Sequence, residues 1–154
     1  MNDVKRDRNG ILWIGTTEGL NSFDGNSITT YYKYNHPKLA ANDILQVICD
    51  NENRIWLRTP TNVVTMLDAK RNFHSFPVGD TSETNIPINY LLTKTKGLIV
   101  RTANGHYVLN TLTNRFENWK TVIDSFLPEA ARFVEPFDEN EFLFYGNNRV
   151  LLID

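Results

Sequence analysis

The chain alternates short apolar runs with polar turns, and this pattern returns at a spacing of 43 residues. The run Ile11–Thr16 lies between two turn-forming segments, Asp7–Gly10 and Thr17–Gly19. Short runs rich in β-branched and aromatic residues, bounded by Gly, Asn and Asp, are typical of β-strands. The pattern leaves no room for a long helix. It therefore predicts an all-β repeat protein.

Several positions keep one register through successive copies of the repeat. These are Trp13, Trp56, Ile99 and Phe142; Ile14, Leu57, Val100 and Leu143; Thr16, Thr59 and Thr102; Gly19, Asn62, Gly105 and Asn148; and, in the inner strand, Val4, Val47, Tyr90 and Phe133. A repeat of this length with four strands is typical of a β-propeller blade.

The four repeats predict blades at approximately 1–34, 43–77, 86–120 and 130–154. The first unit lacks most of its inner strand and the last ends before its fourth strand. The sequence thus predicts a partial β-propeller of about three and a half four-stranded blades. Because a propeller needs about four or more blades to close, we expect an excerpt of a larger propeller. The alternative is that several copies assemble into one ring.

Composition narrows the classes of function. The formal net charge is -2 and basic residues are scattered, so we expect no nucleic-acid partner. The single cysteine allows no intrachain disulfide. The three histidines have no metal-ligand spacing, and no phosphate-binding glycine loop precedes a helix, so we expect no metal and no cofactor. The first ten residues have no apolar signal-peptide core.

The best-formed copy carries a recognisable motif. It is DRNGILWIGTTEGLNSFD, spanning residues 7–24, and it resembles the two-component regulator propeller repeat, D-x-x-G-x-[IL]-W-[IL]-G-T-x-x-G-[IL]-x-x-[FY]-[DN]. The second copy keeps Asp50, Trp56 and Thr59 but has Arg58 at the position of Gly15. The third has Arg101 there and no tryptophan, and the fourth is barely recognisable.

This resemblance implies a function that the composition alone does not show. Repeats of this family form the periplasmic sensor region of hybrid two-component systems in gut Bacteroidetes. The resemblance implies a periplasmic module that senses oligosaccharides and regulates polysaccharide utilisation. It also implies partners: the remaining blades, a following immunoglobulin-like domain, a second copy in a homodimeric sensor, and a histidine kinase elsewhere in the protein.

The motif itself describes how a blade is built. Asp7 and Gly10 shape a turn in which glycine adopts a positive φ. Trp13 fills the space between blades, and Gly15 allows a neighbouring strand to approach. The same residues are similar to the Asp-box turn of sialidases, but the spacing differs by one residue and no catalytic set accompanies them.

The candidate ligand-binding residues lie where the copies depart from the motif. Arg58 and Arg101 occupy equivalent positions in consecutive blades, where they could bind an anionic sugar or carboxylate. The plainer interpretation is that each stacks on an aromatic ring such as Trp56 or pairs with an acid. Tyr34 and His36 lie in YYKYNHPKL, where aromatic side chains could stack on a sugar or simply pack the outer strand.

The sequence therefore predicts a ligand-binding sensor module with no catalytic residues. One alternative is a protein-interaction scaffold, although the Gly-His and Trp-Asp marks of WD-type blades are missing. Another is a propeller glycosidase or lyase, which would need a pair of carboxylates facing the axis.

Overall fold

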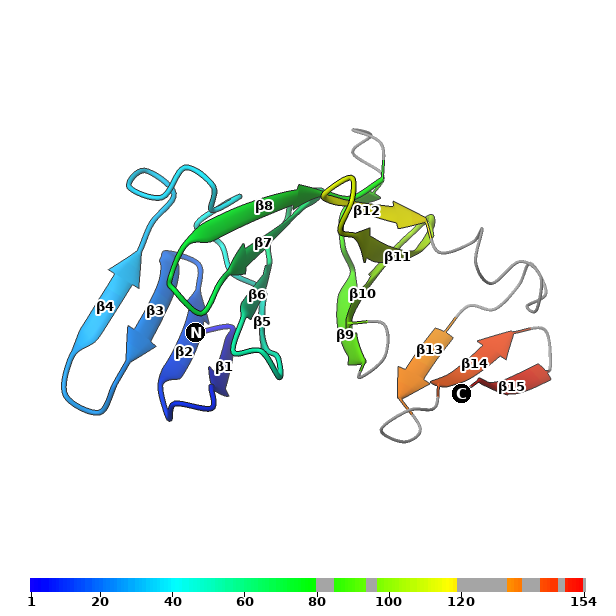
Figure 1. The fold of residues 1–154 in the computed structure, drawn as a ribbon, viewed down its shortest axis with the longest axis horizontal. Helices are drawn as coiled ribbons and strands as arrows, with labels where there is room; N and C mark the ends of the chain where they lie inside the picture. The colour runs from blue at the N-terminus through cyan, green and yellow to red at the C-terminus, as the bar shows by residue number, and fades with distance from the viewer. Residues whose placement is uncertain (80–84, 94–96, 119–132, 137–141, 147–148, 154) are drawn as a thin grey trace.

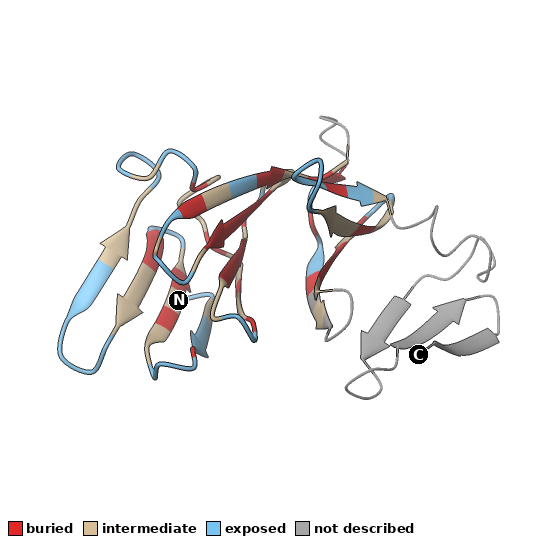
Figure 2. Cartoon of the chain, viewed as in Figure 1, coloured by how far each residue is buried: buried red, intermediate tan, exposed pale blue. Residues whose placement is uncertain are grey.

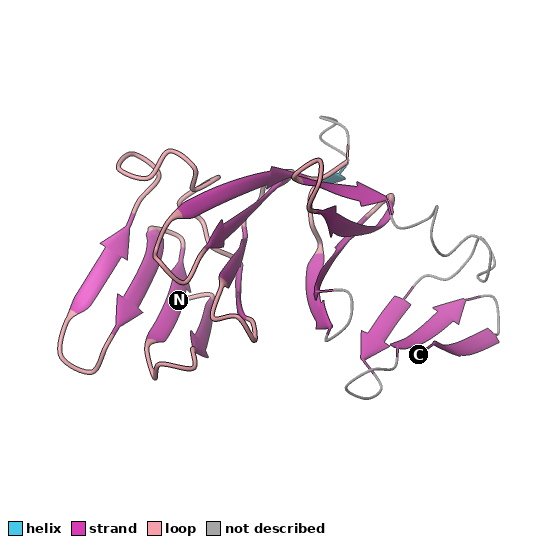
Figure 3. Cartoon of the chain, viewed as in Figure 1, coloured by secondary structure: helices cyan, strands magenta, loops and turns pink. Residues whose placement is uncertain are grey.

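The computed structural model describes residues 1–154 except 80–84, 94–96, 119–132, 137–141, 147–148 and 154, and its strands form four separate sheets (Figure 1). No α-helix occurs in the part of the chain that it describes, which confirms the all-β prediction (Figure 3). The strands are β1 (Asp3–Arg6), β2 (Leu12–Thr16), β3 (Gly19–Phe23), β4 (Ile28–Tyr31), β5 (Gln46–Cys49), β6 (Ile55–Arg58), β7 (Val63–Leu67), β8 (Phe73–Pro77), β9 (Asn89–Thr93), β10 (Gly97–Thr102), β11 (Gly105–Asn110), β12 (Arg115–Asn118), β13 (Phe133–Pro136), β14 (Phe142–Gly146) and β15 (Arg149–Ile153).

Each sheet is an antiparallel meander in which strands pair in chain order. The first three sheets have four strands each, and the fourth contains β13, β14 and β15. The expectation of a curtailed inner strand in the first unit is wrong, because β1 pairs with β2 over four residues, from Asp3 opposite Gly15 to Arg6 opposite Leu12. The first blade is therefore complete.

The spacing of 43 residues holds along the two inner strands of the first three sheets. Gly15, Arg58 and Arg101 pair with Asp3, Gln46 and Asn89 respectively. It fails in the fourth sheet, where Phe133 lies opposite Tyr145 and not opposite Leu143. Phe133 therefore does not share the inner-strand register of Val4, Val47 and Tyr90.

The spacing also fails in the second hairpin of the second sheet. Ile14 pairs with Asn21 in the first sheet, but Leu57 pairs with Thr65, one residue beyond the expected Val64. The equivalence of Gly19 with Asn62 is thus wrong. The tight turn of the first sheet needs a positive φ at Gly19, whereas Pro60 fixes a negative φ and is accommodated by a longer loop.

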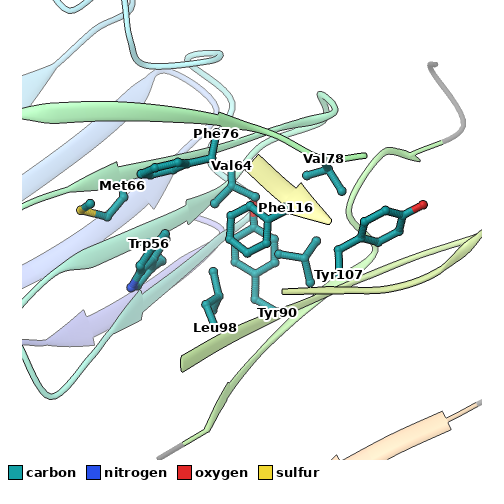
Figure 4. Close-up of a cluster of buried hydrophobic side chains, with 10 residues drawn as sticks. Trp56, Val64, Met66, Phe76, Val78, Tyr90, Leu98, Tyr107 and Phe116 are labelled. Atoms are coloured by element: carbon teal, nitrogen blue, oxygen red, sulfur yellow. The ribbon is translucent and has the colours of Figure 1, made fainter. Parts of the chain in front are cut away.

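Two clusters of buried apolar side chains lie between successive sheets. The strands β6 and β7 of the second sheet, which takes part in both clusters, are largely buried (Figure 2). The core between the first and second sheets contains Trp13, Leu20, Leu39, Ile44, Val47, Ile55, Leu57, Leu67 and Phe73. The core between the second and third contains Trp56, Val64, Met66, Phe76, Val78, Tyr90, Leu98, Val100, Tyr107 and Phe116 (Figure 4). Because side chains alternate along a strand, the second sheet contributes one face to each core.

A buried aspartate accepts a hydrogen bond from each of the two tryptophans at this position of the repeat, Trp13 and Trp56. The Oδ1 atom of Asp7 accepts hydrogen bonds from the backbone N–H of Asn9 (2.9 Å) and Ile11 (3.0 Å), and its Oδ2 accepts from Trp13 Nε1 at 3.0 Å. Asp50 repeats the arrangement, and its Oδ2 accepts from Trp56 Nε1 at 2.8 Å. The aspartate therefore joins the turn to the interblade core as well as shaping the turn.

An arginine covers each of these tryptophans. Arg71, from the turn between β7 and β8, lies 4.4 Å from the Trp13 ring centroid, and its Nη2 is 3.6 Å from Asp7 Oδ2. Arg54 lies 5.4 Å from the centroid of Trp56 and donates from Nε to Asp50 Oδ2 at 2.6 Å. Arg71 belongs to the second sheet and Trp13 to the first, so their contact joins the two blades. Cation–π contacts of this kind strengthen when they are desolvated.

The outer hairpin of the second sheet uses the same turn with histidine as the aromatic partner. Asp68 Oδ1 accepts from the backbone N–H of Lys70 and of Asn72, each at 2.9 Å, and Asp68 Oδ2 lies 3.0 Å from His74 Nε2. The contact with His74, followed by the backbone N–H of Asn72, lowers the pKa of Asp68 below its ordinary value. The folded turn thus favours the ionised carboxylate.

This shift predicts an acid-dependent loss of stability. Because the folded protein holds the Asp68 proton less tightly than the unfolded chain, the contribution is present above the ordinary carboxyl pKa of 3.8 and is lost below it. We expect the urea concentration at the midpoint of unfolding to fall less between pH 7 and pH 3 in Asp68→Asn than in the parent protein. The exposed Glu18→Gln serves as the control. Equal acid losses in the parent and Asp68→Asn would contradict the prediction.

Across the described ranges, no helix is long and apolar enough to span a membrane.

Candidate functional site

The candidate site lies where the inner strands begin and the second strands end. Backbone N–H groups of Asn2, Leu45 and Ile88 donate to the carbonyls of Gly15, Arg58 and Arg101 in turn. This repeated bond sets the same local geometry in three consecutive blades. Arg58 and Arg101 therefore occupy equivalent places around the arc, on the edge that also carries the loops between blades (Figure 1).

Gly15 occupies the equivalent place in the first blade, where a side chain would not fit. A Cβ atom on Gly15 would lie 2.8 Å from Ile44 Cγ2. Ile44 is fully buried and its N–H donates to the Thr16 carbonyl at 2.8 Å. The segment that approaches Gly15 is therefore the connection just before β5, not a strand as predicted, and arginines occupy the equivalent place in the second and third blades.

Arg58 is half-buried and has a neutral partner. Its Nε donates to Gln46 Oε1 at 3.2 Å, and no ion pair joins it to an acidic residue within the described part of the chain. The interpretation that Arg58 stacks on Trp56 or pairs with an acid is not what the structure shows, because Arg54 takes both roles. The positive charge of Arg58 is thus not neutralised by a described carboxylate.

Tyr90 borders Arg58 from the next inner strand. Its hydroxyl donates to the carbonyl of Leu57 at 3.2 Å, and the residue is buried. Burial raises the pKa of Tyr90 far above its ordinary value, and the charge of Arg58 opposes this only in part. The phenol therefore stays neutral and links the third blade to the backbone of β6 next to Arg58.

Arg101 has a histidine opposite it on β11. The two residues are register partners, and His106 is half-buried. Burial, and then the Arg101 charge, lowers the pKa of His106 below its ordinary value. Near neutral pH the imidazole is therefore uncharged. Its Nε2 is buried and makes no hydrogen bond to a residue that the structure describes.

The equivalent corner of the first blade is acidic. Asp3 Oδ2 accepts from the Val47 N–H at 2.8 Å, and Asp3 Oδ1 lies 3.7 Å from Lys5 Nζ. The three equivalent inner-strand positions hold Asp3, Gln46 and Asn89. They supply one carboxylate and two amides. The pairs at this place are thus Asp3 with Gly15, Gln46 with Arg58 and Asn89 with Arg101, so a guanidinium occurs in the second and third blades.

The structure separates Tyr34 from His36. The Tyr34 side chain is 80% exposed and stacks on Tyr32, with ring centroids 5.4 Å apart and planes inclined by 21°. His36 is half-buried, and its ring lies 4.7 Å from Phe73 and 5.4 Å from Tyr31. Tyr34 thus presents a ring to solvent, whereas His36 packs against the outer part of the first core.

The loop that carries Tyr34 is held in place by hydrogen bonds. Lys33 N–H donates to Asn42 Oδ1 at 2.7 Å, and Lys33 Nζ donates to the Ala40 carbonyl at 2.8 Å. Ser75 Oγ donates to the Lys38 carbonyl at 2.6 Å, which ties the loop to the second blade. These hydrogen bonds therefore fix the backbone of the loop from which the Tyr34 ring projects.

Metal binding and thiol chemistry each require particular side chains in the described part of the chain. No group of three or more His, Cys, Asp or Glu residues that could hold a metal occurs in the described ranges. Cys49 is half-buried, and burial raises its pKa to about 11, so the reactive thiolate is scarce at neutral pH. Of the candidate residues, Arg58 has no ion pair with a described carboxylate, and Tyr34 presents an exposed aromatic ring.

Sequence reasoning did not find Gln46, Tyr90 or His106 as neighbours of the arginines. The spacing of 43 residues from Asp3 leads to Gln46 and Asn89, so that signal was available for the inner-strand positions. The pairing of His106 with Arg101 depends on the hairpin register. The contact of Tyr90 with the second blade is a tertiary one, and no local pattern indicates it.

Comparison with known proteins identifies the fold. No family model and no curated protein matches the chain. Solved structures do match: the extracellular domain assigned to the hybrid two-component system BT3049 of B. thetaiotaomicron has a TM-score of 0.63 and 22% identity, and the match covers 92% of this chain and 21% of that one. The corresponding domain of BT4673 from the same organism has a TM-score of 0.65 and 18% identity, covering 99% and 23%.

A third match is an enzyme. Streptogramin B lyase has a TM-score of 0.67 and 16% identity, covering 99% of this chain and 53% of the lyase. The chain spans about a fifth of the two extracellular domains and about half of the lyase. The fold is thus the one shared by these proteins, and two of them are extracellular domains assigned to hybrid two-component systems, the class of protein that the motif at residues 7–24 resembles.

Proposed function

We propose that the chain is part of the sensor propeller of a hybrid two-component system of the Bacteroides type. The observation that carries the proposal is a coincidence of two signals. The motif at residues 7–24 resembles the two-component regulator propeller repeat, and the fold matches extracellular domains of such systems over nearly the whole chain. Because a propeller fold alone hosts many functions, it is the motif that favours a two-component sensor over other propeller proteins.

The proposed ligand is an oligosaccharide, and the surface favours one with acidic groups. Arg58 and Arg101 can each form two parallel hydrogen bonds with a carboxylate, a geometry that lysine cannot offer. Tyr34 adds an exposed ring of the kind that packs against the apolar face of a sugar. His36 is left out of this surface because its ring packs against Phe73.

The proposed location and partners are those that the resemblance of residues 7–24 implies. We place the module in the periplasm, as the extracellular part of a sensor that regulates polysaccharide utilisation. Its proposed partners are the remaining blades, an immunoglobulin-like domain and a second sensor subunit. Binding would alter the relative positions of these parts and so reach a kinase elsewhere in the protein.

A lyase is the second candidate, because one matching structure is a lyase. His106 would be the natural base, since it is uncharged near neutral pH and lies opposite Arg101. Two features argue against it. The free Nε2 is buried away from solvent, and the equivalent inner-strand positions supply a single carboxylate, Asp3, where a facing pair would be needed. We therefore propose a non-enzymatic role for this module.

Removal of the arginines tests the binding site. We expect Arg58→Ala with Arg101→Ala to weaken the binding of oligogalacturonides by about tenfold or more, because a hydrogen bond to a charged group contributes about 1.5–3 kcal/mol. Calorimetric titration of the purified chain measures this change. Incubation of the same mixtures, followed by ultraviolet detection of unsaturated products, tests the lyase alternative.

Arg8→Ala is the matched control. Arg8 is an exposed arginine in the β1–β2 turn, at the opposite end of the strands, and donates to Asn51 Oδ1 at 2.7 Å. We expect this variant to bind as the parent does, and a neutral maltooligosaccharide to respond to none of the arginine changes. Equal affinity in the parent and the double arginine variant would remove Arg58 and Arg101 from the proposed site.

A further inference from the structure

The chain has two Asn-Gly steps, Asn9–Gly10 and Asn104–Gly105, and their surroundings differ. An asparagine that precedes glycine is especially prone to spontaneous deamidation, because glycine has no Cβ to keep its nitrogen away from the asparagine side chain. In a folded protein the reaction also requires an amide group that can turn toward the nitrogen of the next residue. The contacts of the two side chains therefore decide which step reacts.

The side chain of Asn9 is exposed in the turn between β1 and β2 and has no fixed position. Within the described part of the chain, no residue makes a hydrogen bond with it. Gly10 has a φ of 84°, and a Cβ there would meet nothing within 4 Å, so the space beside its nitrogen is open. That nitrogen donates to the Asp7 carbonyl at 3.1 Å, near the long end of the usual range. The Asn9 amide can therefore approach the Gly10 nitrogen.

The side chain of Asn104 is held by a buried residue. Its Nδ2 donates to Asn85 Oδ1 at 3.2 Å, and Asn85 is only 3% exposed and also accepts from the Tyr107 hydroxyl at 3.0 Å. Gly105 already belongs to β11, where it pairs with Thr102. Attack by the Gly105 nitrogen would break the contact with Asn85 and disturb the hairpin. The second Asn-Gly step is therefore protected.

A third exposed asparagine, Asn26, precedes a serine, which is also a small residue. The backbone nitrogen of Ser27 donates to Asp24 Oδ1 at 2.7 Å, and its hydroxyl donates to Asp24 Oδ2 at 3.0 Å. Both bonds keep the nitrogen of Ser27 turned toward Asp24. This step is therefore also less favourable than Asn9–Gly10.

We propose that Asn9 is a site of spontaneous deamidation, and that its isoaspartyl product weakens the turn that holds Trp13. The Gly10 nitrogen attacks Cγ of Asn9. The new N–Cγ bond forms, the Cγ–Nδ2 bond breaks, and the Nδ2 group leaves as ammonia with the proton that the Gly10 nitrogen loses. Water then adds to either carbonyl of the resulting succinimide and opens it to aspartate or isoaspartate. The reaction needs water alone as co-reactant.

Isoaspartate matters here because it lengthens the main chain between residues 9 and 10 by one methylene. Asp7 Oδ1 accepts from the backbone N–H groups of Asn9 and Ile11, and Asp7 Oδ2 accepts from Trp13 Nε1. A longer main chain displaces the N–H of Ile11 from the Asp7 carboxylate. A change at an exposed residue thus reaches the core between the first two blades through Asp7.

Ageing of the purified chain at mildly alkaline pH, followed by peptide mapping with mass spectrometry, tests the site. In the folded chain we expect Asn9 to deamidate about tenfold faster than Asn104, since the contact of Asn104 with Asn85 must open before reaction. In urea, where that contact is absent, we expect the two steps to react at similar rates. Equal rates in the folded chain, or reaction at Asn9 only after unfolding, would overturn the proposal.

Two variants separate the causes. Gly10→Ala adds a Cβ that meets nothing within 4 Å, and it should slow reaction at Asn9 and leave Asn104 unchanged. Asn9→Asp carries the charge of the product on a main chain of normal length. We expect the isoaspartyl form, separated by ion exchange, to have a lower urea midpoint than Asn9→Asp. Equal midpoints would overturn the proposed effect on the turn.

Discussion

Replacing Trp13 with alanine should lower the free energy of unfolding by about 3–5 kcal/mol, the range found for large aromatic residues removed from cores. Trp13 is fully buried between the first two blades, under the guanidinium of Arg71 and beside Asp7. Its loss would create a cavity and leave the buried Asp7 carboxylate without one of its donors. Urea unfolding followed by circular dichroism measures the change.

The contribution of the aspartate can be separated from that of the ring. Trp13→Phe keeps most of the apolar volume but removes the Nε1 donor, and we expect it to cost about 1–3 kcal/mol, as for an unsatisfied buried group. Asp7→Asn should cost a similar amount, and the double variant less than the sum, because the two side chains share one hydrogen bond. Additive losses would show that the bond contributes nothing to stability.

Replacing Gly19 with alanine should destabilise the chain by about 3 kcal/mol or more. Gly19 has a φ of 117°, which side chains rarely adopt, and a Cβ there would lie 2.6 Å from the backbone oxygen of Tyr31. Backbone strain of this kind costs about 1–3 kcal/mol, and forcing extra atoms into a packed site adds about 1–3 kcal/mol. The clash is with backbone, which cannot rotate away.

Gly10→Ala is the matched control for Gly19→Ala. Gly10 also has a positive φ, of 84°, but a Cβ there would meet nothing within 4 Å. We expect this variant to lose only the strain component, about 1 kcal/mol. If the two variants had equal urea midpoints, the close approach of the Tyr31 carbonyl would not limit this position, and the prediction for Gly19 would fail.

Much of the candidate site could be found from the sequence. The spacing of 43 residues placed Arg58 and Arg101 at equivalent positions, and the inner-strand pairing shows that equivalence directly. The sequence also indicated Tyr34 and His36 as aromatic residues at an outer strand and the loop that follows it, where they could stack on a sugar or pack the strand. The sequence could not show that Tyr34 and His36, two residues apart, have different surroundings. The Tyr34 ring faces solvent, whereas the His36 ring packs on Phe73 from the second blade, and this contact depends on how the blades pack.

The side-chain contacts of the arginines could not be predicted from the sequence either. Trp56 is followed by Arg58 in the same strand, and a stacking contact between them was a reasonable expectation. The guanidinium over Trp56 instead comes from Arg54, held in place by Asp50. Side chains at i and i+2 of a strand share a face without their tips being brought together, whereas the aspartate turn folds Arg54 back over the ring.

The sequence by itself determined the class of structure and the blade motif, because strand period, turn residues and repeat spacing are local properties of the chain. Only the tertiary structure decided which residues meet between blades. The inserted residue in the second hairpin, the shifted pairing of Phe133 and the contact of Arg71 with Trp13 all arise from contacts between separate strands or sheets. Such contacts depend on register and packing, which a 43-residue periodicity constrains but does not fix.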